Sequence, residues 1–191
     1  MPDRNLEFGK FGAQGVKGYE AAARQLDGLV DFIATPVTQR RGMLARLHYL
    51  TRSERATAAA RAAGLTVTDR TLRRWAEGKA TPSAKSLAQL DAAYRRVRRR
   101  NVARHLLQRL NRGGRGTRVE FHPLNQSQVS RPQQRDVSFR TLNVRHWDRM
   151  VEAWAADDDE AMDTAWFDDI TADLGSEYGA YEYVMNIGFA A

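Results

Sequence analysis

Arginine side chains between residues 68 and 79 are suited to the recognition of nucleic acid. This stretch, TDRTLRRWAEGK, places three arginines within five positions. A guanidinium group presents a planar fork of donors, which matches phosphate oxygens and the edge of guanine better than the point charge of lysine does. The residue types and their spacing therefore predict contacts to DNA. The predicted contact residues are Thr68, Asp69, Arg70, Thr71, Arg73, Arg74 and Lys79.

A second group of arginines follows between residues 95 and 104. No glycine or proline occurs from Ser83 to Leu110, and apolar residues recur at helical spacing, which predicts one long helix. Because so basic a helix repels itself unless a polyanion lies alongside, we interpret it as a phosphate-binding arm. The alternatives are a break near Asn101, or neutralisation by acidic residues of the C-terminal third or of a partner. The predicted phosphate contacts are Arg95, Arg96, Arg99, Arg100 and Arg104.

The remaining polar residues do not form the motif of an enzyme. Asp158, Asp159 and Asp169 could hold Mg²⁺, but the acidic segment lacks the glycine and glutamate positions of a calcium-binding loop. An exposed acidic surface is therefore the favoured interpretation. The four histidines are scattered, and the GGRG sequence lacks the lysine of a phosphate-binding loop. We predict no catalytic residue, no metal site and no cofactor.

Two short helices and a turn are predicted to position the first group of arginines. A helix over 56–63 would end at Gly64, and Thr68 would cap a second helix that stops at Gly78. This order is typical of a helix-turn-helix, although the turn is about two residues longer than the common one. A plain helical bundle is the alternative. The apolar stripe predicted for the second helix is Leu72, Trp75 and Ala76.

Positive and negative charges occupy different parts of the chain. The formal net charge is +7 over 191 residues, but residues 40–118 have 21 basic and 4 acidic side chains, and residues 146–191 have 1 and 12. This separation indicates a polyanionic partner for the basic part. The absence of cysteine excludes disulfides and thiolate metal sites. Without an apolar run of membrane-spanning length, we expect a cytoplasmic, nucleoid-associated protein that does not bind membranes.

The fold class predicted from these patterns is mainly α, with a small α+β part at the C-terminus. An N-terminal helix-turn-helix is followed by the long basic helix. Further helices are predicted over 19–34, 40–52 (with Arg46 on its outer face), 145–154 and 157–174. Strands are predicted over 117–122, 137–144 and 178–189, the last pairing with one of the other two.

Four segments follow from this pattern. The first, residues 1–36, is a glycine-rich extension followed by the first helix, and we expect it to be loose as far as residue 18. The others are a helix-turn-helix DNA-binding domain with the arginine-rich helix (37–112), a flexible basic hinge (113–116) and an acidic α+β domain (117–191).

The order of several short motifs is similar to that in a known family. The motifs are Ile33-Ala-Thr-Pro36 leading into Met43-Leu-Ala-Arg-Leu-His-Tyr-Leu50, then Thr71-Leu-Arg-Arg-Trp75, Gly78-Lys79, Thr81-Pro82, Gly113-Gly114 and Thr117-Arg118, with an acidic C-terminus. Over about residues 33–121 the chain resembles the telomere terminal proteins of linear actinobacterial chromosomes and plasmids. The longer turn and the glycine-rich N-terminal extension differ from that family's pattern.

The resemblance implies a protein that binds the ends of a linear replicon. It implies covalent attachment of a side-chain hydroxyl to the 5′ end of the DNA, so that the protein primes synthesis by a DNA polymerase together with a telomere-associated protein. The protein is then a hydroxyl donor rather than an enzyme. By position after the two glycines, the candidate hydroxyls are those of Thr117, Ser127, Ser130, Ser138 and Thr141. Thr117 and Ser130 are preferred because arginines adjoin them.

Two other functions fit the same residues. One is a helix-turn-helix transcriptional regulator of a plasmid, phage or mobile element, acting as a homodimer on half-sites about 34 Å apart. The other is a structural protein whose arginine surface meets an acidic partner.

Overall fold

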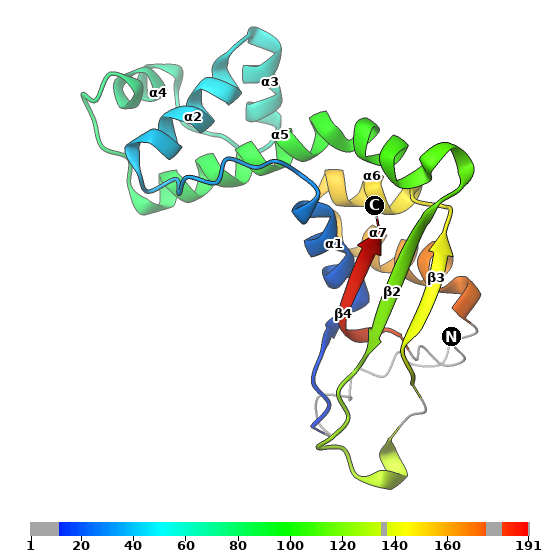
Figure 1. Ribbon diagram of the computed structural model, residues 1–191. Helices are drawn as coiled ribbons and strands as arrows, with labels where there is room; N and C mark the ends of the chain where they lie inside the picture. The colour runs from blue at the N-terminus through cyan, green and yellow to red at the C-terminus, as the bar shows by residue number, and fades with distance from the viewer. Residues whose placement is uncertain (1–11, 135–136, 175–180, 191) are drawn as a thin grey trace. The chain divides into compact units, whose positions relative to one another are not determined.

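The computed structural model describes residues 12–134, 137–174 and 181–190. Its contacts divide the chain into two compact units, one formed by residues 30–102 and the other by residues 1–29 with 103–191. We call these the helical unit and the sheet unit. The described elements are mainly helical, with one small antiparallel sheet, as the sequence predicts (Figure 1). The units divide the chain at other places than the predicted boundaries, because the N-terminal helix belongs with the C-terminal sheet.

The helical unit is built from four helices around one apolar core. They are α2 (Arg40–Thr51), α3 (Glu54–Ala62), α4 (Asp69–Ala76) and the first part of α5 (Ala84–Asn111), which continues into the sheet unit. The buried core residues are Met43, Leu47, Leu50, Ala60, Ala63, Leu65, Leu72, Trp75, Leu90, Ala93, Tyr94 and Val97. Burial of these side chains is what holds the short helices α3 and α4, since helices of this length are marginal alone.

Helices α3 and α4 end in the same way. In each, a glycine with positive φ follows the last turn, Gly64 at +95° and Gly78 at +75°. The N–H groups of Gly64 and Leu65 donate to the carbonyls of Arg61 and Ala60, which satisfies carbonyls that the helix end would leave unpaired. The predicted stripe of α4 is correct for Leu72 and Trp75, but Ala76 is exposed.

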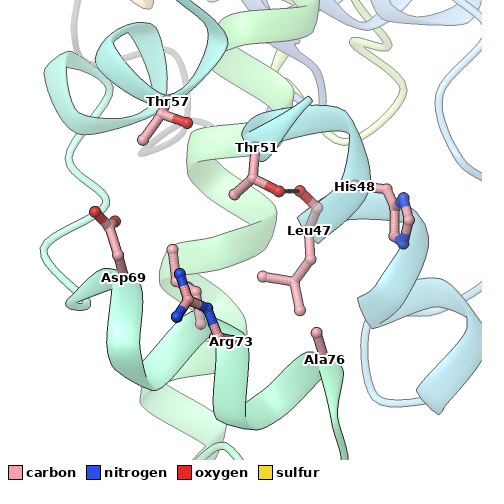
Figure 2. A pocket seen from close by; sticks show the side chains of 8 residues that line it. Leu47, His48, Thr51, Thr57, Asp69, Arg73 and Ala76 are labelled. Carbon is pink, nitrogen blue, oxygen red and sulfur yellow. Dashed lines mark hydrogen bonds between the residues drawn. The ribbon is translucent and has the colours of Figure 1, made fainter. Parts of the chain in front are cut away.

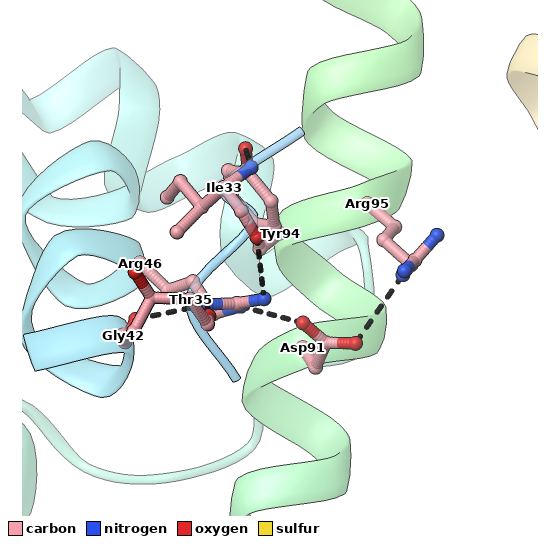
Figure 3. Close-up of polar contacts among 7 residues, drawn as sticks. All are labelled: Ile33, Thr35, Gly42, Arg46, Asp91, Tyr94 and Arg95. Atoms are coloured by element: carbon pink, nitrogen blue, oxygen red, sulfur yellow. Dashed lines mark hydrogen bonds and ion pairs between the residues drawn. The ribbon is translucent and has the colours of Figure 1, made fainter. Parts of the chain in front are cut away.

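Arg46 of α2 is buried, which corrects its predicted outward position. Its guanidinium is 2.5 Å from the carboxylate of Asp91 on α5. It also donates to the carbonyl oxygens of Thr35 (2.8 Å), Gly42 (3.0 Å) and Ile33 (3.2 Å) (Figure 3). A charge taken out of water needs this many partners, so Arg46 joins the 33–35 segment to α2 and α5.

The sheet unit contains four antiparallel strands in the order β1-β4-β2-β3. Strand β2 (Thr117–Pro123) confirms the predicted strand at 117–122, and it pairs with both β3 (Arg140–Val144) and β4 (Tyr183–Ala190). Strand β3 starts three residues later than predicted, and β4 starts at Tyr183 and ends one residue beyond the predicted end. Residues 178–180 of the predicted last strand lie outside the described residues. Strand β1 (Val16–Lys17) pairs with β4, although the sequence predicts a loose segment there.

Three helices of the sheet unit are α1 (Gly18–Gly28), α6 (Asp148–Ala156) and α7 (Asp159–Ala165). In Figure 1 they lie on one side of the strands. Helix α1 ends six residues before the predicted Ala34, because Phe32 and Ile33 instead contact Tyr94 in the helical unit. Helix α7 is followed by a wider helical turn, Trp166–Ile170, and a short 3-10 turn, Ala172–Leu174, so the predicted helix to 174 is not regular.

A packed turn replaces the flexible hinge predicted at 113–116. The Gly116 N–H donates to the Asn111 carbonyl at 3.0 Å, and Gly116 is buried with a positive φ of +75°. The next residue, Thr117, is fully buried, and its hydroxyl donates to the Leu110 carbonyl at 2.6 Å. These contacts join the end of α5 to the start of β2.

Candidate nucleic-acid interface

Helix α4 presents a row of charged side chains opposite its buried face. Leu72 and Trp75 point into the core. At 100° per residue, Arg70, Arg73 and Arg74 lie on the opposite side of the helix, and all three are exposed. We call these three residues the α4 arginine row. Among the described residues, neither Arg70 nor Arg73 has a carboxylate partner in an ion pair. Their charges therefore remain available to a ligand.

The N-terminus of α4 is held by a cap and by an arginine from α3. The Thr68 hydroxyl accepts from the Thr71 N–H at 3.3 Å. Arg61 donates to the Leu65 carbonyl at 2.8 Å and to the Val67 carbonyl, and its guanidinium also pairs with Asp69. The turn between α3 and α4 is longer than the common one, but these contacts fix it. Arg61 was not among the predicted site residues, because its contacts to the Leu65 and Val67 carbonyls depend on the path of the turn.

The C-terminus of α4 is also surrounded by positive side chains. Arg40 donates to the Ala76 carbonyl at 3.3 Å, and Arg74 to the Lys79 carbonyl at 3.5 Å. Cations at this end are favoured because the helix dipole is negative there. Lys79 lies 2.8 Å from the carboxylate of Glu77 and holds the pKa of that group below its usual value, with Arg73 contributing. Arg74 and Lys79 are therefore partly engaged within the fold.

A hollow of about 370 Å³ lies between α2, α3 and α4, with both polar and apolar side chains in its lining. Asp69 and Arg73 line it from α4, and Thr51 and His48 line it from α2 (Figure 2). The Thr51 hydroxyl is directed to the Leu47 carbonyl at 2.8 Å, so it is not free to bind a ligand as a donor. Of the α4 arginine row, Arg73 lines this hollow.

Several arginines of α5 that are predicted to contact phosphate make contacts within the protein. Arg95 pairs with Asp91 at 3.3 Å and lies 4.9 Å over the ring of Phe32. Arg96 donates to the Ala63 carbonyl at 3.4 Å, at the end of α3, and Arg99 is also engaged. Among the described residues, Arg100 and Arg104 are exposed and have no partner, but Arg104 belongs to the sheet unit.

The start of α3 adds positive charge that the sequence analysis did not single out. Ser53 caps the helix by accepting from the Ala56 N–H at 3.2 Å. Arg52 and Arg55, on either side of this cap, are exposed, and Arg52 lies 4.7 Å over the ring of Tyr49. A capping serine with arginines one residue before it and two residues after it is the local signal that could have identified them, because a helix N-terminus favours anions.

The helical unit has far more basic than acidic side chains. Residues 30–102 contain 16 lysines and arginines against 5 aspartates and glutamates, a formal charge of +11. Even if every carboxylate of the unit paired with one cation, most of its arginines would remain unneutralised by the unit itself. Such a surface attracts polyanions.

The two hydroxyls predicted as attachment sites differ in access. Thr117 is fully buried and hydrogen-bonded, so it is not an accessible nucleophile. Ser130 is exposed and precedes the exposed Arg131, and its hydroxyl is 2.6 Å from the side-chain oxygen of Gln133. Only Ser130 of this pair can meet a nucleotide without unfolding.

The acidic residues considered for Mg²⁺ have other roles. Asp169 binds Arg149 through both oxygens, at 2.8 and 2.6 Å, and this raises the pKa of the arginine. Asp158 caps α7 by accepting from the Ala161 N–H at 3.0 Å. Within the described ranges, no group of three acidic or histidine side chains could hold a metal ion, and no helix is long and apolar enough to cross a membrane.

Comparisons of the chain with protein-family models, with curated proteins and with solved structures gave no match.

Proposed function

We propose that the helical unit binds double-stranded DNA through a helix-turn-helix formed by α3 and α4. In this proposal α4 enters the major groove, and Arg70 and Arg73 reach base edges. The observation that carries the proposal is the α4 arginine row, opposite a buried Leu72 and Trp75 and with Arg70 and Arg73 free of carboxylate partners among the described residues. Arginine bound through two donors to guanine is the commonest specific contact to a base.

Fixed helix ends support this function. Helix α4 has only eight residues, and an isolated helix of this length would fray. Thr68 and Arg61 fix its start, and Gly78 with Arg40 fixes its end. A helix that is already ordered loses less entropy on binding, so more of the contact energy appears as affinity.

Phosphate contacts are assigned to exposed arginines elsewhere in the helical unit. Arg52 and Arg55 flank the capped start of α3, and Arg100 is exposed on α5. In helix-turn-helix proteins the first helix crosses the DNA backbone, which is the role proposed for α3. These contacts provide affinity for any sequence, whereas the α4 arginine row provides base preference.

The test is selection of bound duplexes from a random pool with the full chain, followed by affinity measurements on the selected site. We expect a defined site, and a loss of about 1–3 kcal/mol with relaxed preference at one base pair for Arg70→Ala or Arg73→Ala. Lys85→Ala, which removes an equal charge from an exposed position of the helical unit, is the matched control. A wild-type protein without sequence preference, or a control that relaxes the same base pair, would contradict the assignment.

The role at replicon ends is a narrower proposal that rests on the family resemblance. The Ser130 hydroxyl would attack the α-phosphate of a nucleotide bound by a polymerase, forming a serine phosphodiester and releasing pyrophosphate. Its support here is that Ser130 is exposed beside Arg131. After phenol extraction and nuclease digestion of native protein, a residual nucleotide mass on Ser130, absent from Ser130→Ala, is the expected result. Native protein without any attached nucleotide would rule out priming.

A transcriptional regulator would use the same α4 contacts. It predicts a homodimer and a palindromic selected site with half-sites about 34 Å apart. A protein at replicon ends instead predicts preferential binding to terminal or hairpin sequences. The pool therefore includes hairpin ends, and the symmetry of the selected site distinguishes these two roles.

A further inference from the structure

No helix in the described part of the chain covers one face of the sheet in the sheet unit. Val119 and Phe121 of β2 are buried, and the alternate residues Arg118, Glu120 and His122 point to the other side. In Figure 1, helices α1, α6 and α7 lie behind the strands, on the buried side. We call the other side the open sheet face. By register, the residues next to these on the open sheet face are Thr141, Asn143, Asn186, Gly188 and Ala190.

An aromatic pair is exposed at one end of the open sheet face. The rings of His122 and Phe139 meet edge to face with centroids 5.2 Å apart. Phe139, just before β3, is 50% exposed, and Met185 on β4 is 46% exposed; they are the two large hydrophobic side chains left exposed among the described residues. A phenyl ring in water costs free energy that a stacked planar ligand would recover.

Arginines gather at the other end of the same strands. Arg118 lies on the open sheet face, where it is paired with Ala190 of β4. Arg112 donates to the Ala190 carbonyl at 3.4 Å. Arg115 donates to the Arg112 carbonyl at 3.3 Å, and all three arginines are exposed. The four steps along the strand from Arg118 to His122 span about 13 Å, so cations and aromatic rings are separated by the length of a short oligonucleotide.

We propose that the open sheet face binds single-stranded nucleic acid. Unstacked bases would lie on Phe139 and His122, and the backbone phosphates would lie against Arg112, Arg115 and Arg118. Exposed aromatic side chains on a sheet combined with a basic path are the two elements of single-strand recognition, because every base has a face that stacks. A duplex does not offer this contact, since its bases are already stacked on each other.

Glu120 lies between the two ends and carries the opposite charge. Its carboxylate is 3.5 Å from the Arg118 guanidinium, and both side chains are more than 40% exposed. Such an exposed pair is weak and exchanges readily with a phosphate. The carboxylate should weaken binding by repelling the backbone, so Glu120→Gln is expected to raise single-strand affinity.

The site is tested in the full chain with a labelled oligothymidylate, an oligouridylate and a duplex. Phe139→Ala is expected to lower affinity for one or both single strands by about fivefold or more, and to leave duplex affinity unchanged. The ratio of DNA to RNA affinity then identifies the kind of strand. Phe139→Leu, which keeps an apolar side chain without a stacking ring, should lose as much as Phe139→Ala if stacking is the contact.

Arg118→Ala is compared with the control Arg140→Ala. Arg140 is paired with the buried Phe121, so by register it lies on the face of the sheet opposite to Arg118. Only the first should weaken single-strand binding.

Photocrosslinking of an iodouracil oligonucleotide is expected to modify His122 or Phe139. Crosslinks confined to residues 30–102, or unchanged affinity of the Phe139 variants, would overturn the proposal. A concentration-dependent dimer that Phe139→Ala dissociates would overturn it too, and would make this face an interface between two copies.

Discussion

The guanidinium of Arg46 shows how an arginine in a basic unit can belong to the core. It is 4% exposed, lies 5.3 Å over the ring of Tyr94, and contacts the carboxylate of Asp91 and three backbone carbonyls. Its donors are therefore used within the protein. Arg46 therefore contributes to the net charge of the helical unit but not to the positive charge that its surface presents to a ligand.

Arg46→Lys should destabilise the helical unit by about 2–4 kcal/mol, because an ammonium cannot satisfy Asp91 and the three carbonyls together. The measurement is the free energy of unfolding in urea. Arg95→Lys, which alters the other partner of Asp91 at a position 45% exposed, should cost less than about 1 kcal/mol. Equal losses in the two variants would mean that the Arg46 contacts contribute little.

Two glycines in the turn after α5 should respond differently to substitution. A Cβ at Gly116 would lie 2.4 Å from the Val144 carbonyl oxygen, whereas a Cβ at Gly113 would have no neighbour within 4 Å. Both residues have positive φ, so the substitution to alanine costs about 1–2 kcal/mol at either from the backbone alone.

Gly116→Ala should therefore destabilise the sheet unit more than Gly113→Ala does, by the additional cost of moving β3 away. Thermal unfolding followed by far-ultraviolet circular dichroism gives the comparison. If Gly113→Ala were the more destabilising of the two, residues 112–117 would not form this packed turn in solution.

At the scale of elements, the sequence predicted best where a local signal sets a helix end. Thr68 and Gly64 act within a few residues of their own helices, so residue type alone indicates where α3 stops and α4 starts. The same sequence could not show that Val16 pairs with Val184, because that contact joins segments far apart in the chain. The apolar pattern also continues through Phe32 and Ile33, which led to the prediction that the first helix reaches Ala34. In the structure these two residues pack against the core of the helical unit.

The candidate interface was predictable to a similar degree. Arg70 and Arg73 follow from the 3.6-residue period of α4 and lie where the pattern indicates. The contacts of Arg95 with Asp91 and of Arg96 with the Ala63 carbonyl could not be predicted from the sequence, because they depend on how the helices pack. Thr117 was selected for its arginine neighbours, but strand alternation directs its side chain inward.

Strand β4 and helix α1 each contribute a tyrosine whose ionisation is opposed by the fold. Burial raises the pKa of Tyr19 and Tyr183 above the ordinary 10.0, and nearby carboxylates, among them Asp163, add to this. The neutral phenols are thus favoured in the folded state. Their contribution to stability is complete below pH 10.0 and is lost as the pH rises through the folded-state pKa values.

The free energy of unfolding should therefore fall as the pH is raised above 10.0, and more steeply in the wild type than in Tyr19→Phe/Tyr183→Phe, which has no phenol at these positions. Urea titrations at a series of alkaline pH values provide the comparison, with each single variant expected between the two. Parallel curves for wild type and double variant would show that other groups control alkaline unfolding.

At the scale of the whole molecule, net charge is a poor guide to where a polyanion binds. The chain has +7 overall, but the helical unit has +11, and the sheet unit, with 14 basic and 18 acidic residues, has −4. Counterion release depends on how many phosphates meet cations directly, and not on the charge of the entire protein. Two variants with the same net charge can therefore separate these quantities.

Arg100→Gln and Arg140→Gln each remove one positive charge, the first from the helical unit and the second from β3 of the sheet unit. Both residues are exposed. If the helical unit contacts duplex DNA, Arg100→Gln should reduce the slope of log K against log salt concentration by about 0.9, whereas Arg140→Gln should leave it unchanged. Fluorescence anisotropy with one duplex at several salt concentrations measures both slopes. Equal reductions would indicate that the overall charge, rather than the surface of the helical unit, determines binding.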